Sequence, residues 1–200
     1  MKTQDLSLLL QSFPAKAQVL VAPLNWGIGH ASRCIPIIRQ LIAQDFQPVI
    51  ASDGAALLLL QQVFPQLETY ELPAYKVRYA ANARLFHLKI LSQLYHFYKT
   101  YQAEKRVINQ IIQHRKIEVM LSDNRFGVFS KQAISIYMTH QLRVKSGITT
   151  YLTTQMHRFF IRNFDRIWVP DVSHEPSLSG ELSHGIRMDK PVTYLEYSAL

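Results

Sequence analysis

The stretch Val19–Arg33 constrains the fold more than any other part of the chain. An apolar run over residues 19–22 is typical of a buried strand. The loop after it contains Gly27 and Gly29, which allow a positive φ and a close backbone approach, and a helical pattern follows. A strand, a glycine turn and a helix in this order direct free helix N–H groups at an anion or polar ligand. We therefore predict the floor of a binding site here, with a glycine turn that only redirects the chain as the alternative.

The rest of the chain alternates predicted strands with predicted helices. Further strands are predicted at residues 46–51, 67–72, 117–121, 133–138, 166–170 and 191–195, and helices at 31–44, 55–63, 84–114 and 156–164. The long helix has room for one break, near residues 99–102. This order predicts a Rossmann-like, three-layer α/β domain with a mostly parallel sheet. We expect the domain to span residues 17–195, after a flexible leader or short helix over 1–16 and before a tail over 196–200.

Polar residues follow three of the predicted strands, at the ends where open parallel sheets bind ligands. They are His30 and Arg33 after the first strand, Asp123, Asn124 and Arg125 after the fourth, and Thr139 and His140 after the fifth. Because the carboxyl ends of parallel strands share one edge of the sheet, we expect these side chains to converge. Chance placement of polar residues in such loops is the alternative interpretation.

Other site motifs fit the sequence poorly. The dinucleotide fingerprint Gly-x-Gly-x-x-Gly is half present, because Ser32 stands in the third position, although Asp53 is placed like its ribose-binding acid. The histidines are scattered, without a cysteine pair or a His-x-x-x-His spacing, so we predict no metal site and no cofactor. The sequence also lacks the P-loop motif and the Gly-x-Ser-x-Gly motif of serine hydrolases.

The charge of the chain favours anionic partners. It has 22 Lys and Arg residues against 14 Asp and Glu residues, a formal net charge of +8. A nucleic-acid binder is an alternative that this charge alone motivates. Because no known nucleic-acid-binding motif accompanies the charge, we predict no nucleic-acid partner. Cys34 is the only cysteine, which excludes an internal disulfide and favours a reducing, cytoplasmic location. No apolar run approaches the roughly 20 residues of a membrane span.

Aromatic and basic residues are interleaved along Arg84–Arg106. Such a helix either lies on a membrane surface or is an ordinary helix with one face in the core and a basic face in water. The first interpretation predicts peripheral contact with the inner face of the membrane, and the second predicts none.

The segment Asn25-Trp-Gly-Ile-Gly-His-Ala-Ser-Arg33 resembles the Gly-x-Gly-His-x-x-Arg segment that opens the N-terminal domain of GT-B glycosyltransferases, in particular the MurG-like branch of UDP-sugar transferases. Ser122–Gly127, Tyr137–Leu142 and Trp168–Asp171 are similar to segments of a bacterial glycosyltransferase-like group in that branch. The similarity extends over most of residues 18–195. It implies two Rossmann-like domains that face a cleft, with this chain as the N-terminal, acceptor-side domain.

The resemblance also implies a reaction, the transfer of a hexosyl group from a UDP-sugar to a lipid-linked or glycan acceptor. It places Gly27, Gly29 and His30 near the donor diphosphate and the acceptor hydroxyl, with His30 as the catalytic residue. His30 would act as a general base or as a hydrogen-bond donor to the leaving diphosphate. Arg33 and Arg125 would neutralise phosphate charge. The other expected substrate contacts are Asp123, Asn124, Thr139 and His140.

The sequence departs from this family in its length. It ends at Leu200, whereas two domains of about 150–200 residues would need roughly twice as many. Glu196 and Tyr197 stand where relatives have a Gly-Pro-rich entry to the linker. We therefore expect the C-terminal donor domain to be absent and the isolated chain to be inactive. A non-catalytic domain that binds a phosphate or phosphosugar ligand is the alternative.

Overall fold

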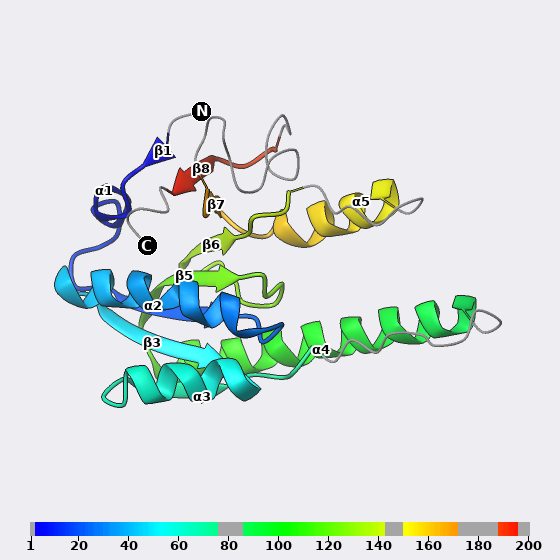
Figure 1. Cartoon of the computed structure of the whole chain (residues 1–200), viewed down its shortest axis with the longest axis horizontal. Helices are drawn as coiled ribbons and strands as arrows, with labels where there is room; N and C mark the ends of the chain where they lie inside the picture. The colour runs from blue at the N-terminus through cyan, green and yellow to red at the C-terminus, as the bar shows by residue number, and fades with distance from the viewer. Residues whose placement is uncertain (1–2, 76–85, 143–149, 172–187, 196–200) are drawn as a thin grey trace.

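The computed structural model describes residues 3–75, 86–142, 150–171 and 188–195. The strands are β1 (Thr3–Gln4), β2 (Gln18–Pro23), β3 (Gln47–Ser52), β4 (Thr69–Glu71), β5 (Ile117–Asp123), β6 (Ile134–Met138), β7 (Arg166–Val169) and β8 (Val192–Leu195). The helices are α1 (Leu6–Leu10), α2 (Ile28–Ala43), α3 (Gly54–Val63), α4 (Phe86–His114) and α5 (Thr150–Ile161). Within these residues one eight-stranded sheet forms in the order β1-β8-β7-β6-β5-β2-β3-β4, with every neighbouring pair parallel (Figure 1). The predicted α/β fold class is confirmed.

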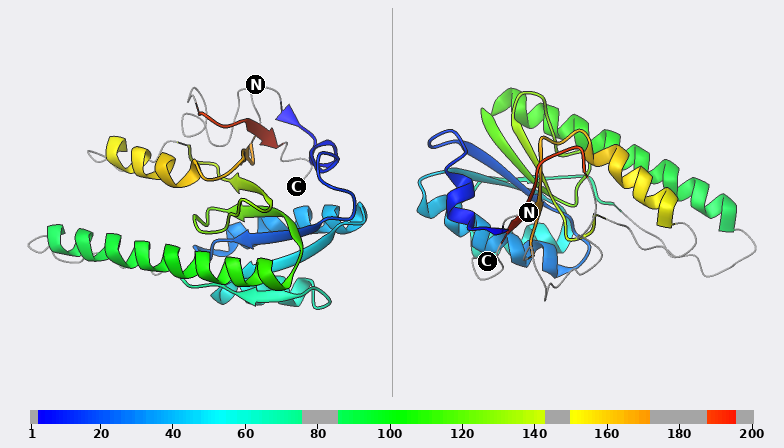
Figure 2. Two further views of the ribbon diagram at one scale, coloured as in Figure 1. Left: turned by 180° about the vertical axis from the view of Figure 1, so that it is seen from behind. Right: turned by 90° about the horizontal axis from the view of Figure 1, so that it is seen from above.

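Both faces of the sheet are apolar, which explains the continuous apolar runs in the sequence. In β2, Val21 packs into the core beneath α2, whereas Leu20 and Ala22 pack into the core beneath α4. Helices α1, α2 and α3 cover the first face, and α4 and α5 cover the second (Figure 2). The sheet is therefore the middle of three layers.

Residues 3–13 are part of the domain, and of the two alternatives for this stretch the structure shows the short helix rather than the flexible leader. Strand β1 pairs with β8, and Leu6 and Leu10 of α1 are buried in the core. Phe13 stacks on Trp168 with 6.0 Å between the ring centroids. Leu6 and Leu10 are buried because the two ends of the described chain meet at one edge of the sheet.

Helices α2, α4 and α5 differ from their predicted bounds. Helix α2 begins at Ile28 rather than Ala31, and α5 begins at Thr150 rather than Met156. Helix α4 is continuous, so the break near residues 99–102 is absent. Arg84 lies outside the described residues. The N-terminal parts of α4 and α5 extend past the carboxyl ends of the strands (Figure 1).

Candidate functional site

Four of the predicted site residues meet at the carboxyl edge of the sheet, beside the N-terminus of α2. His30 and Arg33 lie in the first turns of α2, Asp123 ends β5, and His140 follows β6. Strands β6, β5 and β2 are consecutive in the sheet, so their carboxyl ends adjoin. The predicted convergence is confirmed for these four side chains, which we call the edge cluster.

Asp123 is the centre of the edge cluster. Its carboxylate is fully buried and accepts hydrogen bonds from Arg33 Nε, at 2.6 Å to Oδ2, and from Arg33 Nη2. Its Oδ2 also lies 3.1 Å from His30 Nδ1. Arg33 Nη1 lies 3.3 Å from His140 Nδ1, and Nη2 contacts His30 Nδ1. A bidentate guanidinium–carboxylate pair holds both groups in one plane, so the cluster is ordered without a ligand.

The tautomer of His30 determines what its ring can do. If Nδ1–H donates to Asp123, then Nε2 is free to accept a proton. If Nδ1 instead accepts from Arg33, then Nε2 carries the proton and can donate to a phosphate oxygen. The side chain of His30 is 13% exposed, so solvent or a ligand can reach it.

His140 is held as a neutral imidazole. Burial, followed by the positive charge of Arg33 and the electrostatic effect of the neighbouring His30, lowers the pKa of His140 below its usual value. A neutral ring can accept the hydrogen bond that Arg33 Nη1 directs at its Nδ1. His140 therefore orients the guanidinium without adding a second charge beside it.

Gly27 and Gly29 occupy different structural positions at the start of α2. Gly27 is the N-cap of α2 with φ at +90°, a conformation that other residues rarely adopt. Gly29 lies within α2, and a Cβ built on it meets no atom within 4 Å. The turn therefore needs glycine at 27, while glycine at 29 leaves open space in the first turn of the helix.

Arg125 lies in the interior, which corrects its prediction as a phosphate contact. The residue is fully buried, and it donates to Asp53 Oδ1 through Nη1 at 3.1 Å and through Nη2 at 2.6 Å. Its Nε lies 3.1 Å from Oε1 of Glu104, which is also fully buried. Two buried carboxylates already neutralise this cation, so Arg125 is not available to a phosphate. Asp53 is equally engaged and does not resemble a free ribose-binding acid.

Asn124 and Thr139 serve the turns that follow their strands. Asn124 has φ at +61°, and its Oδ1 accepts from the Tyr137 hydroxyl at 3.1 Å. Thr139 is buried, and its Oγ1 accepts from the Gln141 N–H at 3.1 Å. Because both side chains have protein partners, we do not assign them to ligand binding.

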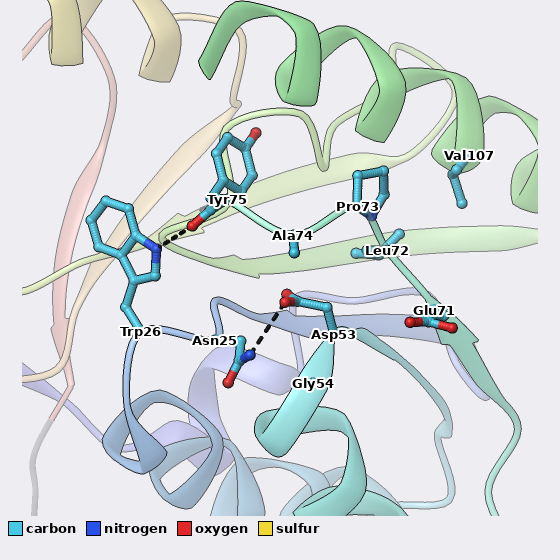
Figure 3. Close-up of a pocket in the computed structure, with 10 residues that line it drawn as sticks. All are labelled: Asn25, Trp26, Asp53, Gly54, Glu71, Leu72, Pro73, Ala74, Tyr75 and Val107. Carbon is cyan, nitrogen blue, oxygen red and sulfur yellow. Dashed lines mark hydrogen bonds between the residues drawn. The ribbon is translucent and has the colours of Figure 1, made fainter. Parts of the chain in front are cut away.

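A pocket of about 1250 Å³ adjoins the same loop, and the sequence analysis missed it. Its lining residues are Asn25, Trp26, Asp53, Gly54, Glu71, Leu72, Pro73, Ala74, Tyr75 and Val107 (Figure 3). Figure 3 shows Asn25 and Asp53 across the pocket from the Pro73–Tyr75 segment. His30 and Arg33 are not among the lining residues, so the pocket and the edge cluster are separate features joined by the loop. The residue in the sequence that could have indicated this pocket is Trp26, a large aromatic residue in a glycine-containing loop. Trp26 is 51% exposed.

Helix α4 has features of both alternatives for the basic, aromatic segment, namely a face in the core and exposed aromatic rings. Among its residues with described side chains, Ile108 packs in the core, whereas Tyr95 and Tyr98 are exposed. Lys99 Nζ lies 5.1 Å from the Tyr95 ring centroid. On α5, Phe159 is exposed as well. None of the helices in the described ranges is long and apolar enough to cross a membrane.

No group of three or more His, Cys, Asp or Glu side chains suited to a metal ion occurs in the part of the chain that the structure describes. At the edge cluster, the guanidinium of Arg33 contacts Asp123, His30 and His140. Asp123, His30 and His140 have side chains of the types that bind metals, and in this structure they surround the guanidinium cation of Arg33.

Comparisons with known proteins give structural similarities only. No protein-family model and no curated protein matches the chain. MurG from Acinetobacter baumannii is similar over 88% of this chain and 44% of its own, at 12% identity and a TM-score of 0.45. A transferase from Siraitia grosvenorii in complex with UDP covers 77% and 44%, at 13% identity and a TM-score of 0.46. A UDP-glucosyltransferase from Polygonum tinctorium covers 80% and 47%, at 11% identity and a TM-score of 0.49.

The chain thus spans less than half the length of each of these solved chains. At 11–13% identity the likeness concerns the fold alone.

Proposed function

We propose that this chain is the acceptor-side domain of a glycosyltransferase. The whole enzyme would transfer a hexosyl group from a UDP-sugar to a lipid-linked or glycan acceptor. The observation that carries the proposal is the edge cluster, in which Arg33, His30 and Asp123 meet beside the N-terminus of α2. The resemblance of the Asn25–Arg33 segment to the glycosyltransferase motif supports the same reaction.

The edge cluster offers the two kinds of group that glycosyl transfer uses. Negative charge grows on the leaving diphosphate as its bond to the sugar breaks, and Arg33 with the N–H groups that begin α2 can stabilise that charge. The acceptor hydroxyl must lose a proton, and the His30 tautomer that donates Nδ1–H to Asp123 has Nε2 free as a general base. Asp123 would then stabilise the imidazolium that forms.

The pocket beside the loop is the proposed place for the acceptor. Its lining mixes apolar side chains, among them Leu72 and Val107, with the carboxylates of Asp53 and Glu71. Apolar walls with a few polar groups are typical of sites for small organic ligands. Trp26 joins this lining to the loop that leads into α2, so an acceptor seated there lies next to the loop that precedes His30.

Binding without catalysis is the second candidate function. Arg33, neutral His140 and a helix N-terminus form a phosphate site that needs no reaction to explain it. In that case the ligand would be a phosphate or a phosphosugar, and no donor domain would be required.

Peripheral membrane contact through α4 and α5 is part of the proposal for a lipid-linked acceptor. It is supported by the exposed rings of Tyr95, Tyr98 and Phe159 together with the formal charge of +8. Both helices extend past the carboxyl edge of the sheet, which is the edge that carries the proposed site (Figure 1).

Ligand titrations followed through histidine NMR signals test the proposed function. The chain is labelled at histidine, and the signals of His30 and His140 are assigned with His30→Gln and His140→Gln. It is then titrated with inorganic diphosphate, UDP, glucose 6-phosphate and a lipid-linked sugar in micelles. We expect diphosphate and the lipid-linked sugar to shift both signals, and Arg33→Met to abolish the effect. His114→Gln, at the exposed end of α4, is the control variant.

The pattern of binding separates the two functions. Saturable binding of glucose 6-phosphate, with no effect of the lipid-linked sugar, supports the phosphosugar-binding domain. Absence of any shift at His30 and His140 contradicts both, because each function requires a ligand at the edge cluster.

A further inference from the structure

Six residues form a closed ring of contacts beside the pocket. In order around the ring they are Arg125, Asp53, Asn25, Trp26, Tyr75 and Glu104. Asn25 and Trp26 are joined by their peptide bond, and every other step is a hydrogen bond or an ion pair. Asn25, Asp53 and Tyr75 follow β2, β3 and β4, and they are far apart in the sequence. The ring therefore connects the carboxyl ends of these three strands.

Four steps around the ring are hydrogen bonds. The step from Arg125 Nε to Glu104 Oε1, at 3.1 Å, is an ion pair in which neither atom has the geometry of a hydrogen bond. Asn25 Nδ2 donates to Asp53 Oδ2 at 3.2 Å, and Trp26 Nε1 donates to the Tyr75 carbonyl at 2.9 Å. The Tyr75 hydroxyl donates to Glu104 Oε2 at 2.7 Å. Both walls of the pocket are therefore attached to the same set of side chains.

Arg125 and Glu104 are the two members that do not line the pocket, and both are fully buried. Besides Asp53 and Glu104, Arg125 contacts the Pro73 carbonyl at 3.2 Å through Nη2. It therefore reaches Asp53 on one wall and Pro73 on the other. Glu104 Oε2 also accepts from the Gly127 N–H at 2.7 Å, which anchors the ring to the turn after β5.

The start of α3 shows how far this arrangement departs from local rules. Asp53 is the N-cap of α3, yet its carboxylate accepts no N–H of that helix. Asn25 Oδ1 accepts the Ala56 N–H at 3.3 Å instead, from another strand end. A Cβ on Gly54 would lie 2.3 Å from Asn25 Nδ2, so Asn25 is closely packed there. Arg125 thus engages the usual cap, and Asn25 acts as the cap while bonded to Asp53.

We propose that Arg125 is a positioning residue, which sets the separation of the Asn25–Trp26 and Pro73–Tyr75 walls and so places the loop that leads into His30. One planar guanidinium reaches Asp53, Glu104 and Pro73 together. An ammonium group is a compact point charge and cannot hold the same three directions. The inference deepens the proposed function by adding a residue that acts on the site from behind, and its main test uses no substrate.

Fluorine NMR of the two tryptophans tests the proposal. The whole chain is labelled with 5-fluorotryptophan, and the resonances of Trp26 and Trp168 are assigned with Trp26→Phe. Trp168 is buried on the face of the sheet that α1, α2 and α3 cover, opposite the face that carries Glu104 of α4, and it reports on the overall fold. We expect Arg125→Lys to move or broaden the Trp26 resonance while Trp168 keeps its position. Arg115→Lys, in an exposed pair with Glu68, is the matched control and should move neither resonance.

Asp53→Asn provides a second variant in case Arg125→Lys does not fold. It keeps the side-chain shape and removes the charge that holds Arg125, so it should also move the Trp26 resonance. A Trp26 resonance that is unchanged in every folded variant would overturn the proposal. Inorganic diphosphate is then added to the wild type and to each folded variant. If the Trp26 resonance moves in the variants but the wild type does not bind diphosphate, Arg125 is still the positioning residue. That result counts against the proposed function alone.

Discussion

His30 Nδ1 lies 3.1 Å from Oδ2 of Asp123, a carboxylate that is fully buried at the carboxyl end of β5. The same carboxylate receives two N–H groups of Arg33. One buried charge therefore orients both an imidazole and a guanidinium, and it does so in the absence of any ligand. The edge cluster depends on Asp123 more than on either of the groups that we expect a substrate to meet.

Replacement of Asp123 by Asn should separate this role from a general loss of charge. The change keeps the size of the side chain but removes the buried charge that Asp123 places against Arg33, so we expect a loss of about 3 kcal/mol in the free energy of unfolding. Urea unfolding measures this value. Asp45→Asn removes an aspartate from an exposed pair with Lys16 and should change the free energy little. Equal effects of the two changes would contradict the buried pairing.

The two loop glycines should respond to alanine with opposite signs. Gly27→Ala forces an alanine to φ of +90°, so we expect a loss of about 1–2 kcal/mol in the free energy of unfolding. Gly29→Ala places a methyl group in open space on a helix and should gain up to about 1 kcal/mol. Thermal or urea unfolding measures both. If Gly29→Ala nevertheless weakens diphosphate binding, the ligand occupies the open space beside Gly29. Destabilisation of the fold by this change would contradict the helical position of Gly29.

The edge cluster could be predicted from the sequence because topology determines it. His30, Arg33, Asp123 and His140 all follow apolar strands, and the ends of parallel strands share one edge. The sequence did not show which of the two arginines near this edge would face it. Asn124, at φ of +61°, redirects the chain between Asp123 and Arg125. As a result Asp123 contacts α2, and Arg125 contacts Glu104 of α4.

The partners of Arg125 and the packing of α1 were beyond sequence reasoning for a common physical reason. Arg125 pairs with Asp53 across a sequence separation of 72 residues. Likewise Leu6 and Leu10 are buried next to a sheet edge where β1 pairs with β8. Periodicity and local motifs report a residue's own element, whereas these contacts depend on which distant segments the finished sheet brings together.

Exposed aromatic rings on α4 should contribute to membrane binding if that proposal is right. We expect the chain to co-sediment with vesicles of phosphatidylcholine and phosphatidylglycerol, more weakly with phosphatidylcholine alone, and less at high salt. Replacing Tyr95 and Tyr98 together by Ser removes two exposed rings and should weaken binding several-fold. Leu58→Ser removes an exposed apolar side chain from α3, on the other face of the sheet, and is the control. Unchanged sedimentation of the double variant would count against this surface.

His157 should make the stability of the domain sensitive to acid. Its Nε2 lies 3.2 Å from the Tyr137 hydroxyl, and its ring packs edge-on against Phe126. Burial lowers the pKa of His157 from 6.5 to about 4. The unfolded chain therefore binds the proton first as the pH falls. Its contribution to stability is complete above pH 6.5 and is lost as the pH falls toward about 4.

The expected loss from this residue over that interval is about 3 kcal/mol, because one pKa unit corresponds to about 1.4 kcal/mol. Urea unfolding across the pH range, with wild type and His157→Phe compared at each pH, isolates this contribution. His140 also has a lowered pKa and destabilises in the same direction, but it is present in both proteins and cancels in the difference. The wild type should lose stability more steeply than the variant below pH 6.5. Parallel curves would mean that His157 gains its proton as readily in the folded chain as in the unfolded one, contrary to its burial beside Tyr137.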